Sequence, residues 1–190
     1  MTTTRAQTRR VSIDEIKPHP RNPKSHAIDT LVQSIRRFGF VEPIVVDQRT
    51  GLNVSGHGRV EALLRMRDAG EPVPLGIDDE WRAPVFVGWA STDDAEAEAA
   101  LVALNRIGES GGWEERELAD LLLDLQQIER GLDGVGYDDE ELAELRARLG
   151  DYAPDFDPVD ADEQPRLDER APIECGSCGA SIDPTTGAPR

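Results

Sequence analysis

The feature that most constrains the fold is a glycine-rich turn over residues 55–59, between a short apolar run and a helical pattern. The run from Leu52 to Val54 ends abruptly before Gly56, and apolar residues recur at helical spacing from Val60 onward. Glycine adopts positive φ at low cost, so a strand can turn directly into a helix here. The sequence therefore predicts a strand, a tight turn and a helix N-terminus in succession.

This turn combines features that suit an anion-binding site. The free N–H groups of a first helical turn, with the positive end of the helix dipole, attract anions. Arg59 adds a forked charge suited to phosphate. One hypothesis is a phosphate pocket at residues 55–59, in which His57 contacts the ligand or acts as a base. The alternative is a plain strand-to-helix turn with a surface His and Arg, because short Gly-rich turns are weak signals.

Composition limits the classes of function. The net charge is -17, from 38 acidic and 21 basic residues. Such a chain does not bind duplex DNA by general electrostatics, because that affinity depends on neutralising phosphates, and only a locally basic face could do so. No apolar run approaches the roughly 20 residues that span a bilayer, and the N-terminus lacks a secretory signal. We expect a cytoplasmic protein that makes no membrane contact.

A proline loop precedes the first predicted helix. Three prolines within residues 18–23 prevent regular structure. The loop also gathers basic side chains on an acidic protein, namely Lys17, His19, Arg21 and Lys24. It is either a solvated loop or a segment that reaches over a phosphate ligand.

Periodicity and turn residues divide the chain into four parts. We expect a disordered basic arm over residues 1–10, a nucleotide-binding domain over 11–110, a helical extension over 111–150 and an acidic linker or disordered tail over 151–190. Within them the sequence predicts strands over residues 11–16, 41–47, 52–55 and 83–89, and helices over 28–38, 60–69, 93–104, 118–128 and 138–149. Ser91 or Thr92 is the expected N-cap of the third helix.

In this order the segments resemble the N-terminal domain of the ParB family, within the ParB/sulfiredoxin superfamily. The resemblance covers about residues 11–110. It rests on Pro18-His-Pro-Arg-Asn-Pro23, Ser34-Ile35, Gly39-Phe-Val-Glu-Pro-Ile-Val-Val46, Ser55-Gly-His-Gly-Arg59 and Ala103-Leu-Asn-Arg106. It implies an α+β fold with a small mixed β-sheet and packed helices, here followed by the helical extension and the tail.

The resemblance also implies a nucleotide pocket. ParB proteins bind CTP with Mg²⁺ in this domain and use it as a clamp-closing switch. Carried over by motif, three groups of residues would form the pocket: Gly39, Phe40 and Pro43 on the base and ribose side; Gly56, His57, Gly58 and Arg59 on the phosphates; and Asn105 and Arg106 near the metal and phosphates.

The chain departs from the family pattern at the phosphate motif. ParB typically has G-E-R-R where this chain has Gly56-His57-Gly58-Arg59. The lost charge weakens triphosphate binding or changes the nucleotide. Sulfiredoxin needs a reactive cysteine where His57 stands, so its repair chemistry is not expected. The Gly-His-Gly-Arg version most resembles ParB-like domains of phages and mobile elements.

The resemblance therefore implies a module that binds CTP or another NTP, with slow NTPase activity, in phage or mobile-element DNA metabolism. Its partners would be a DNA-processing protein, DNA indirectly, or a second copy in a homodimer. One alternative is a non-catalytic adaptor that keeps the fold without the nucleotide. A second alternative is a ParB-like metal-dependent nuclease, although no clear cluster of carboxylates stands out in the sequence. A third is small-molecule phosphoryl transfer, which no feature of the sequence distinguishes from the other functions.

Two cysteines in the tail, Cys175 and Cys178, resemble one half of a zinc knuckle. A structural zinc site needs four ligands, and this chain offers two cysteines without a nearby histidine. Either a second chain or a partner completes a zinc site, or the motif is degenerate and carries no metal.

Overall fold

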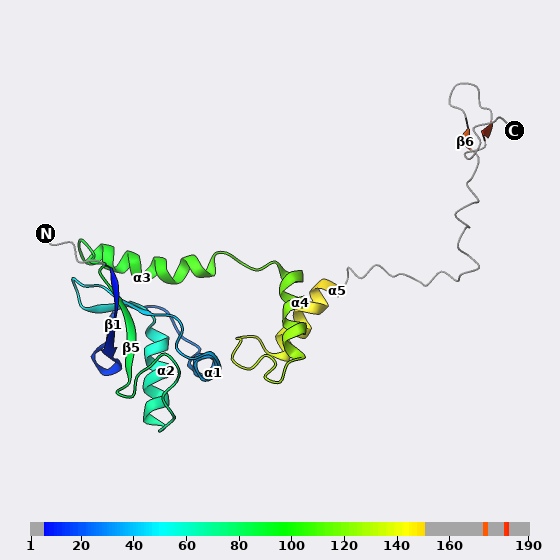
Figure 1. Cartoon of the computed structure of the whole chain (residues 1–190). Helices are drawn as coiled ribbons and strands as arrows, with labels where there is room; N and C mark the ends of the chain where they lie inside the picture. Colours follow the sequence, from blue (N-terminus) through cyan, green and yellow to red (C-terminus); the bar gives the residue numbers. More distant parts are fainter. Residues whose placement is uncertain (1–5, 151–172, 175–180, 183–190) are drawn as a thin grey trace. The chain divides into compact units, whose positions relative to one another are not determined.

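The computed structural model describes residues 6–150, 173–174 and 181–182, and the chain divides into two units between residues 151 and 152. In the first unit the strands are β1 (Gln7–Ser12), β2 (Lys17–Pro18), β3 (Ile44–Val46), β4 (Leu52–Ser55) and β5 (Arg82–Val87). Its helices are a 3-10 turn η1 (Ile13–Glu15), α1 (Ile28–Phe38), α2 (His57–Asp68), α3 (Asp94–Glu109), α4 (Glu115–Gln126) and α5 (Asp139–Gly150), most of them labelled in Figure 1. In the second unit β6 (Ile173–Glu174) pairs with β7 (Ser181–Ile182).

The five strands of the first unit form one mixed sheet in the order β1-β5-β3-β4-β2. β1 lies antiparallel to β5 and β3 antiparallel to β4, whereas β3 runs parallel to β5 and β2 parallel to β4. Helices α1 and α2 pack on each other, and α3 packs against β4. This arrangement confirms the predicted α+β class with a small mixed sheet, packed helices and a helical extension.

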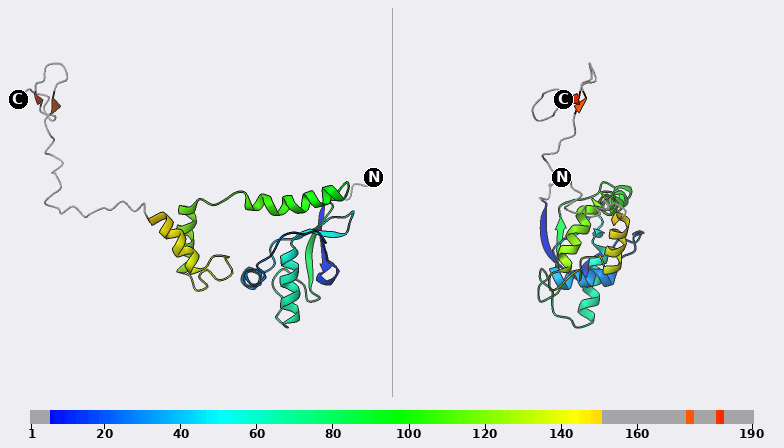
Figure 2. Two further views of the ribbon diagram at one scale, coloured as in Figure 1. Left: turned by 180° about the vertical axis from the view of Figure 1, so that it is seen from behind. Right: turned by 90° about the vertical axis from the view of Figure 1, so that its right-hand side faces the viewer.

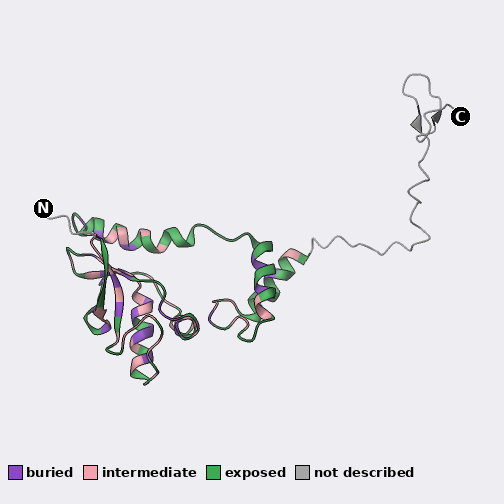
Figure 3. Cartoon of the chain, viewed as in Figure 1, coloured by how far each residue is buried: buried purple, intermediate pink, exposed green. Residues whose placement is uncertain are grey.

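The main core lies between the sheet and the α1–α2 pair, where Figure 3 shows buried residues on β5 and α2. Each helix of the pair turns an apolar stripe inward, as its 3.6-residue periodicity predicts. The buried members include Val32 and Ile35 from α1, Val60, Leu63 and Met66 from α2, and Ile44, Ala83 and Val85 from the strands.

A buried carboxylate fixes the β3–β4 hairpin to the segment before α3. Asp47 is 0% exposed and accepts hydrogen bonds from the backbone N–H of Ser91 at 2.9 Å and its hydroxyl at 2.8 Å. The hydroxyl of Thr50 and the backbone N–H of Arg49 add bonds of 2.8 and 3.1 Å. Four donors offset the cost of removing the carboxylate from water.

The N-terminal region differs from the prediction. Residues 7–10 belong to β1, paired with β5, so the predicted disordered arm is wrong for its second half. Residues 11–16 do not form one strand, because β1 ends at Ser12 and η1 follows. The side chains of residues 7–10 are exposed and polar, so this edge strand has no hydrophobic alternation that the sequence could reveal.

Helix α3 is also longer than predicted, and its cap is a different residue. Its N-cap is Asp93 rather than Ser91 or Thr92, and the Asp93 side chain accepts a hydrogen bond from the Glu96 N–H at 2.9 Å. The helix passes through Gly108 and ends at Glu109. A glycine costs an exposed helix only about 1 kcal/mol, so it did not stop this one.

The last two helices form a small hairpin with its own core, and Figure 2 shows them side by side. Leu118 and Leu122 of α4 pack with Leu142 and Leu145 of α5. A reciprocal cap opens α5, since the Glu141 N–H donates to Asp138 at 2.8 Å and the Asp138 N–H donates to Glu141 at 3.0 Å. The leucines of α4 and α5 therefore serve mainly as a core.

None of the described helices is long and apolar enough to cross a bilayer. The predicted linker or tail over residues 151–190 falls almost wholly outside the described residues.

Candidate functional site

The predicted glycine turn exists, and it opens α2. Gly56 is the N-cap residue, with a left-handed φ of 99° and ψ of 20° that strongly favour glycine. No side chain caps the helix, so its first-turn N–H groups are left to other partners. The first turn of α2 thus retains the geometry that suits an anion.

Arg59 lies beside this turn and is largely enclosed. Its side chain is 14% exposed and forms an ion pair through Nη1 with Glu42, whose own side chain is 74% exposed. Burial lowers the pKa of Arg59 while Glu42 opposes that shift, and an arginine keeps its charge regardless. Glu42 therefore already neutralises the guanidinium charge to which a phosphate would bind.

Gly58 has a packing role that explains one departure from the family motif. A Cβ at this position would lie 2.7 Å from Leu31 Cδ1 and 2.8 Å from His26 Cγ. The loop before α1 and α1 itself thus sit directly on the first turn of α2. An arginine, which the family motif has here, would have to displace both neighbours.

His57 faces the proline loop and a second histidine. Its Nε2 accepts a hydrogen bond from the backbone N–H of His19 at 3.1 Å, and its ring lies nearly parallel to that of His26, with centroids 6.3 Å apart. Burial, then the nearby charges of His26 and His19, lower the pKa of His57 to about 4. The pKa of His26 is also lowered, mainly by burial. His57 is therefore a neutral hydrogen-bonding group near pH 7.

These residues enclose a hollow of about 340 Å³, which we call the histidine cavity. Its lining combines apolar residues with polar ones: Ile16, Pro18, Val60 and Leu64, and His19, Asn22, Lys24, His26, Asn53, His57 and Glu61. All three histidines of the chain line it. The proline loop lies against the start of α2, where the His19 N–H contacts His57.

Asn53 is the unexpected member of this cavity. It lies in β4, is 1% exposed, and neither atom of its side-chain amide has a hydrogen-bond partner among the described residues. Such buried, unpaired polar groups are uncommon in native proteins. Sequence reasoning missed it, although an asparagine inside an apolar strand is itself unusual and offered a signal.

Asn105 and Arg106 lie on α3 beside a separate groove of about 180 Å³, lined also by Pro23, Lys24, Leu101, Val102 and Glu109. Lys24 lines both hollows and forms an ion pair with Glu109 at 2.8 Å. Asn105 Nδ2 donates to the carbonyl of Leu101 at 2.7 Å. The side chain of Lys24 therefore links the predicted metal-side residues to the histidine cavity.

The three residues predicted for the base side lie elsewhere. Gly39 caps α1 at a φ of 79°, and a Cβ there would lie 2.8 Å from the Leu75 carbonyl oxygen. Phe40 is 5% exposed, belongs to the main core, and its N–H donates to the Leu75 carbonyl at 2.7 Å. Pro43 is exposed. None of the three lines the histidine cavity or the groove on α3.

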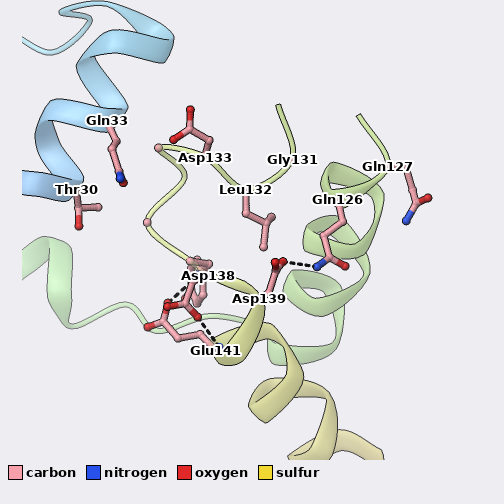
Figure 4. A pocket seen from close by; sticks show the side chains of 13 residues that line it. Thr30, Gln33, Gln126, Gln127, Gly131, Leu132, Asp133, Asp138, Asp139 and Glu141 are labelled. Carbon is pink, nitrogen blue, oxygen red and sulfur yellow. Dashed lines mark hydrogen bonds between the residues drawn. The ribbon is translucent and has the colours of Figure 1, made fainter. Parts of the chain in front are cut away.

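A larger hollow, about 810 Å³, lies between α1 and the α4–α5 hairpin (Figure 4). Four of its polar residues are already engaged with one another: Gln126 donates to Asp139 at 2.6 Å, and Asp138 and Glu141 form the cap of α5. Volume alone therefore does not make it the candidate site.

The described residues contain no group of three or more His, Cys, Asp or Glu side chains arranged to hold a metal ion. Cys175 and Cys178, the predicted half knuckle, lie outside the described residues.

Comparison with known proteins agrees with this architecture. A ParB-like nuclease domain-containing protein, YnaK, from Escherichia coli (strain K12) is 34% identical over 73 residues, which cover 36% of this chain and 83% of that protein. The chain belongs to this ParB-like family. No protein-family model matches the chain.

Among solved structures, the C-terminally truncated chromosome-partitioning protein ParB from Caulobacter crescentus, complexed with CTP-gamma-S, matches with a TM-score of 0.53 and 20% identity. The match covers 76% of this chain and 79% of that one, and it shows the shared fold. A Pnob8-like ParB-N domain matches with a TM-score of 0.37 and 16% identity, over 77% of this chain and 64% of that one.

Proposed function

We propose that the chain is a ParB-like nucleotide-binding module, which holds the phosphates of CTP or another NTP at the first turn of α2. The observation that carries the proposal is the uncapped N-terminus of α2 at Gly56, with Arg59 beside it. Free N–H groups and a guanidinium on one turn suit a phosphate group. The solved structure of ParB with CTP-gamma-S shares this fold, and this likeness supports the proposal.

The other residues take roles consistent with this proposal. His57, neutral at pH 7, would donate from Nδ1 because its Nε2 already accepts from His19. Lys24 would supply a second cation, and Asn105 and Arg106 would approach the phosphates with a bound Mg²⁺. Slow hydrolysis, a role in phage or mobile-element DNA metabolism, and a homodimer belong to the same proposal.

Glu42 makes the proposal unusually testable, because it competes with a phosphate for Arg59. The experiment is calorimetric titration with CTP, ATP, GTP and UTP in Mg²⁺. Arg59→Ala should abolish binding, and Glu42→Gln should tighten it several-fold by releasing the guanidinium. Arg65→Ala is the matched control, because Arg65 lies on the same helix in an exposed ion pair with Asp29.

Absence of binding by any of the four nucleotides at millimolar concentration would overturn the proposal. Arg59 is partly buried, so each variant is first checked for its unfolding temperature. If Arg59→Ala does not fold, the Glu42→Gln result decides by itself, since Glu42 is exposed and its loss leaves the core intact.

A nuclease is the second candidate, supported by the name of the E. coli relative. Nicking of supercoiled plasmid with Mg²⁺ or Mn²⁺ tests it directly. Failure of both assays would make a non-catalytic adaptor the leading function. The partner surface would then be sought at exposed apolar residues on and after α3, such as Ile107 and Trp113, which are 71% and 69% exposed.

A further inference from the structure

Trp113, which lies two residues before α4, differs from the other tryptophans of the chain in its exposure to solvent. It is 69% exposed, whereas Trp81 and Trp89 are partly buried and Trp81 packs against the main core. An indole ring left in water forgoes the favourable burial that large aromatic side chains usually obtain. Exposed tryptophans are enriched among the residues that anchor protein partners.

Trp113 lines a groove of about 230 Å³ on the α4–α5 hairpin, which we call the Trp113 groove. Leu118 of α4 and Leu145 of α5 also line it, and both belong to the hairpin core. Tyr137 adds a second aromatic ring, half-buried against the same core. Because these three residues are held by the packing of the hairpin, much of the lining is fixed in position.

The remaining lining is mainly acidic. It consists of Glu115, Glu141, Glu144 and Arg148, and Arg148 forms an ion pair with Glu115 at 3.5 Å. Glu144 is exposed and takes part in none of the ion pairs formed among residues 6–150. The surrounding segment, residues 111–150, has twelve acidic and four basic residues. A cation is therefore attracted to this groove, and a polyanion such as a nucleic acid is repelled.

Aromatic rings beside carboxylates define the chemistry of the partner. The face of an indole or phenol ring attracts a guanidinium or ammonium group, and a carboxylate forms a charge-assisted hydrogen bond with it. The aliphatic stem of an arginine or lysine packs at the same time on apolar surface such as that of Leu118 and Leu145. The volume is below the range of about 300–1,000 Å³ common for small-molecule sites, and it suits one or two side chains of a peptide.

We propose that the Trp113 groove docks a basic segment of a partner protein, with an arginine or lysine side chain against Trp113 and Tyr137 and paired with Glu144. The argument from charge complementarity favours this occupant over a second copy, because the hairpin of a second copy carries the same excess of acid. The groove shares no lining residue with the histidine cavity, so the inference stands apart from the nucleotide function.

The test uses the full chain and a pair of synthetic peptides that differ in charge alone. The first is acetyl-Ser-Leu-Arg-Arg-Leu-Ser-amide, and the second has citrulline, an uncharged group of similar shape, in place of both arginines. The indole N–H signal of Trp113, assigned by its loss in Trp113→Leu, should shift saturably in NMR spectra as the first peptide is added. The citrulline peptide should leave that signal in place at millimolar concentration.

Two variants and their controls locate the contact, with affinities read from the backbone amide signals of α5. Glu144→Gln should weaken binding of the arginine peptide about two- to fivefold. Glu117→Gln removes the same charge from an exposed position of α4 outside the groove and should leave the affinity unchanged. Trp113→Leu should weaken binding by a similar factor, since it keeps apolar surface and loses the aromatic face. Ile107→Ala, at an exposed apolar residue of α3, is its control.

The results that overturn the proposal are specific. They are an unmoved Trp113 signal, equal binding of the arginine and citrulline peptides, or equal effects of Glu144→Gln and Glu117→Gln. Sedimentation of the wild type and of Trp113→Leu tests the other occupant. A wild-type dimer that Trp113→Leu dissociates would assign the groove to a second copy and also overturn the proposal. Both residues are exposed, so their variants should keep the unfolding temperature of the wild type.

Discussion

The backbone N–H of His19 donates a hydrogen bond to Nε2 of His57 across 3.1 Å, which joins the proline loop to the first turn of α2. Protonation of His57 would put a hydrogen on Nε2 and break this bond. The low pKa of about 4 agrees with that geometry, since burial and two neighbouring histidines also oppose the charge. The bond makes the site sensitive to acid.

The first prediction concerns stability below neutral pH. Between pH 6.5 and about 4 the unfolded chain protonates at this histidine while the folded chain does not, so the contribution of His57 to stability is full above pH 6.5 and is lost as the pH falls toward 4. Because the ring is only about half enclosed, we expect a loss of roughly 1–2 kcal/mol from pH 7 to pH 4.5. His57→Gln, which keeps an acceptor but no titrating ring, should show a smaller loss in urea unfolding.

The second prediction concerns the contact between Gly58 and the loop before α1. Gly58→Ala places a methyl 2.7 Å from Leu31 and 2.8 Å from His26, and it should lower the free energy of unfolding by about 1–3 kcal/mol. Gly108→Ala is the matched control. It lies within α3 with nothing inside 4 Å of the added methyl, and it should raise stability by about 0.5–1 kcal/mol. Equal effects of the two changes would refute the close packing at α2.

The third prediction tests the buried carboxylate of Asp47. Burial alone would raise its pKa, but the hydrogen bonds from Ser91, Thr50 and Arg49 together lower it. Asp47→Asn turns an acceptor into a donor that faces N–H groups, so it should cost about 2–4 kcal/mol in chemical denaturation at pH 7.

Asp29→Asn is the control for this change, because the Asp29 side chain is 83% exposed and its loss should stay within about 0.5 kcal/mol. The wild-type advantage over Asp47→Asn should hold above pH 3.8 and disappear as the pH falls below that value, since the folded pKa is lowered. An advantage that grew in acid would contradict the hydrogen-bonding pattern.

The fourth prediction compares two neighbouring leucines of α4. Leu122 is 1% exposed in the core of the helical hairpin, whereas Leu121 is 55% exposed. Leu122→Ala should cost about 2–4 kcal/mol or unfold the hairpin, and Leu121→Ala should change stability by less than about 0.5 kcal/mol. Helix content and thermal unfolding report both. The reverse order would mean that the leucine stripe faces a partner rather than α5.

The sequence by itself determined the local elements near the site. Helix α1, with Gly39 at its C-terminus, follows from the periodicity of its apolar side chains. The succession of β4, Gly56 and α2 follows from the same kind of periodicity and from the backbone dihedral angles that glycine permits. These signals lie within a few residues of one another, so a reader of the sequence can recover them.

The tertiary structure alone decided what these elements enclose. It brings His19, His26 and His57 to one cavity, buries Asn53 in β4 and pairs Arg59 with Glu42. It also pairs the residues of β1 with those of β5, 70 to 80 positions away in the sequence. Such contacts depend on how the sheet orders its strands and where the helices pack, and no local pattern records that order.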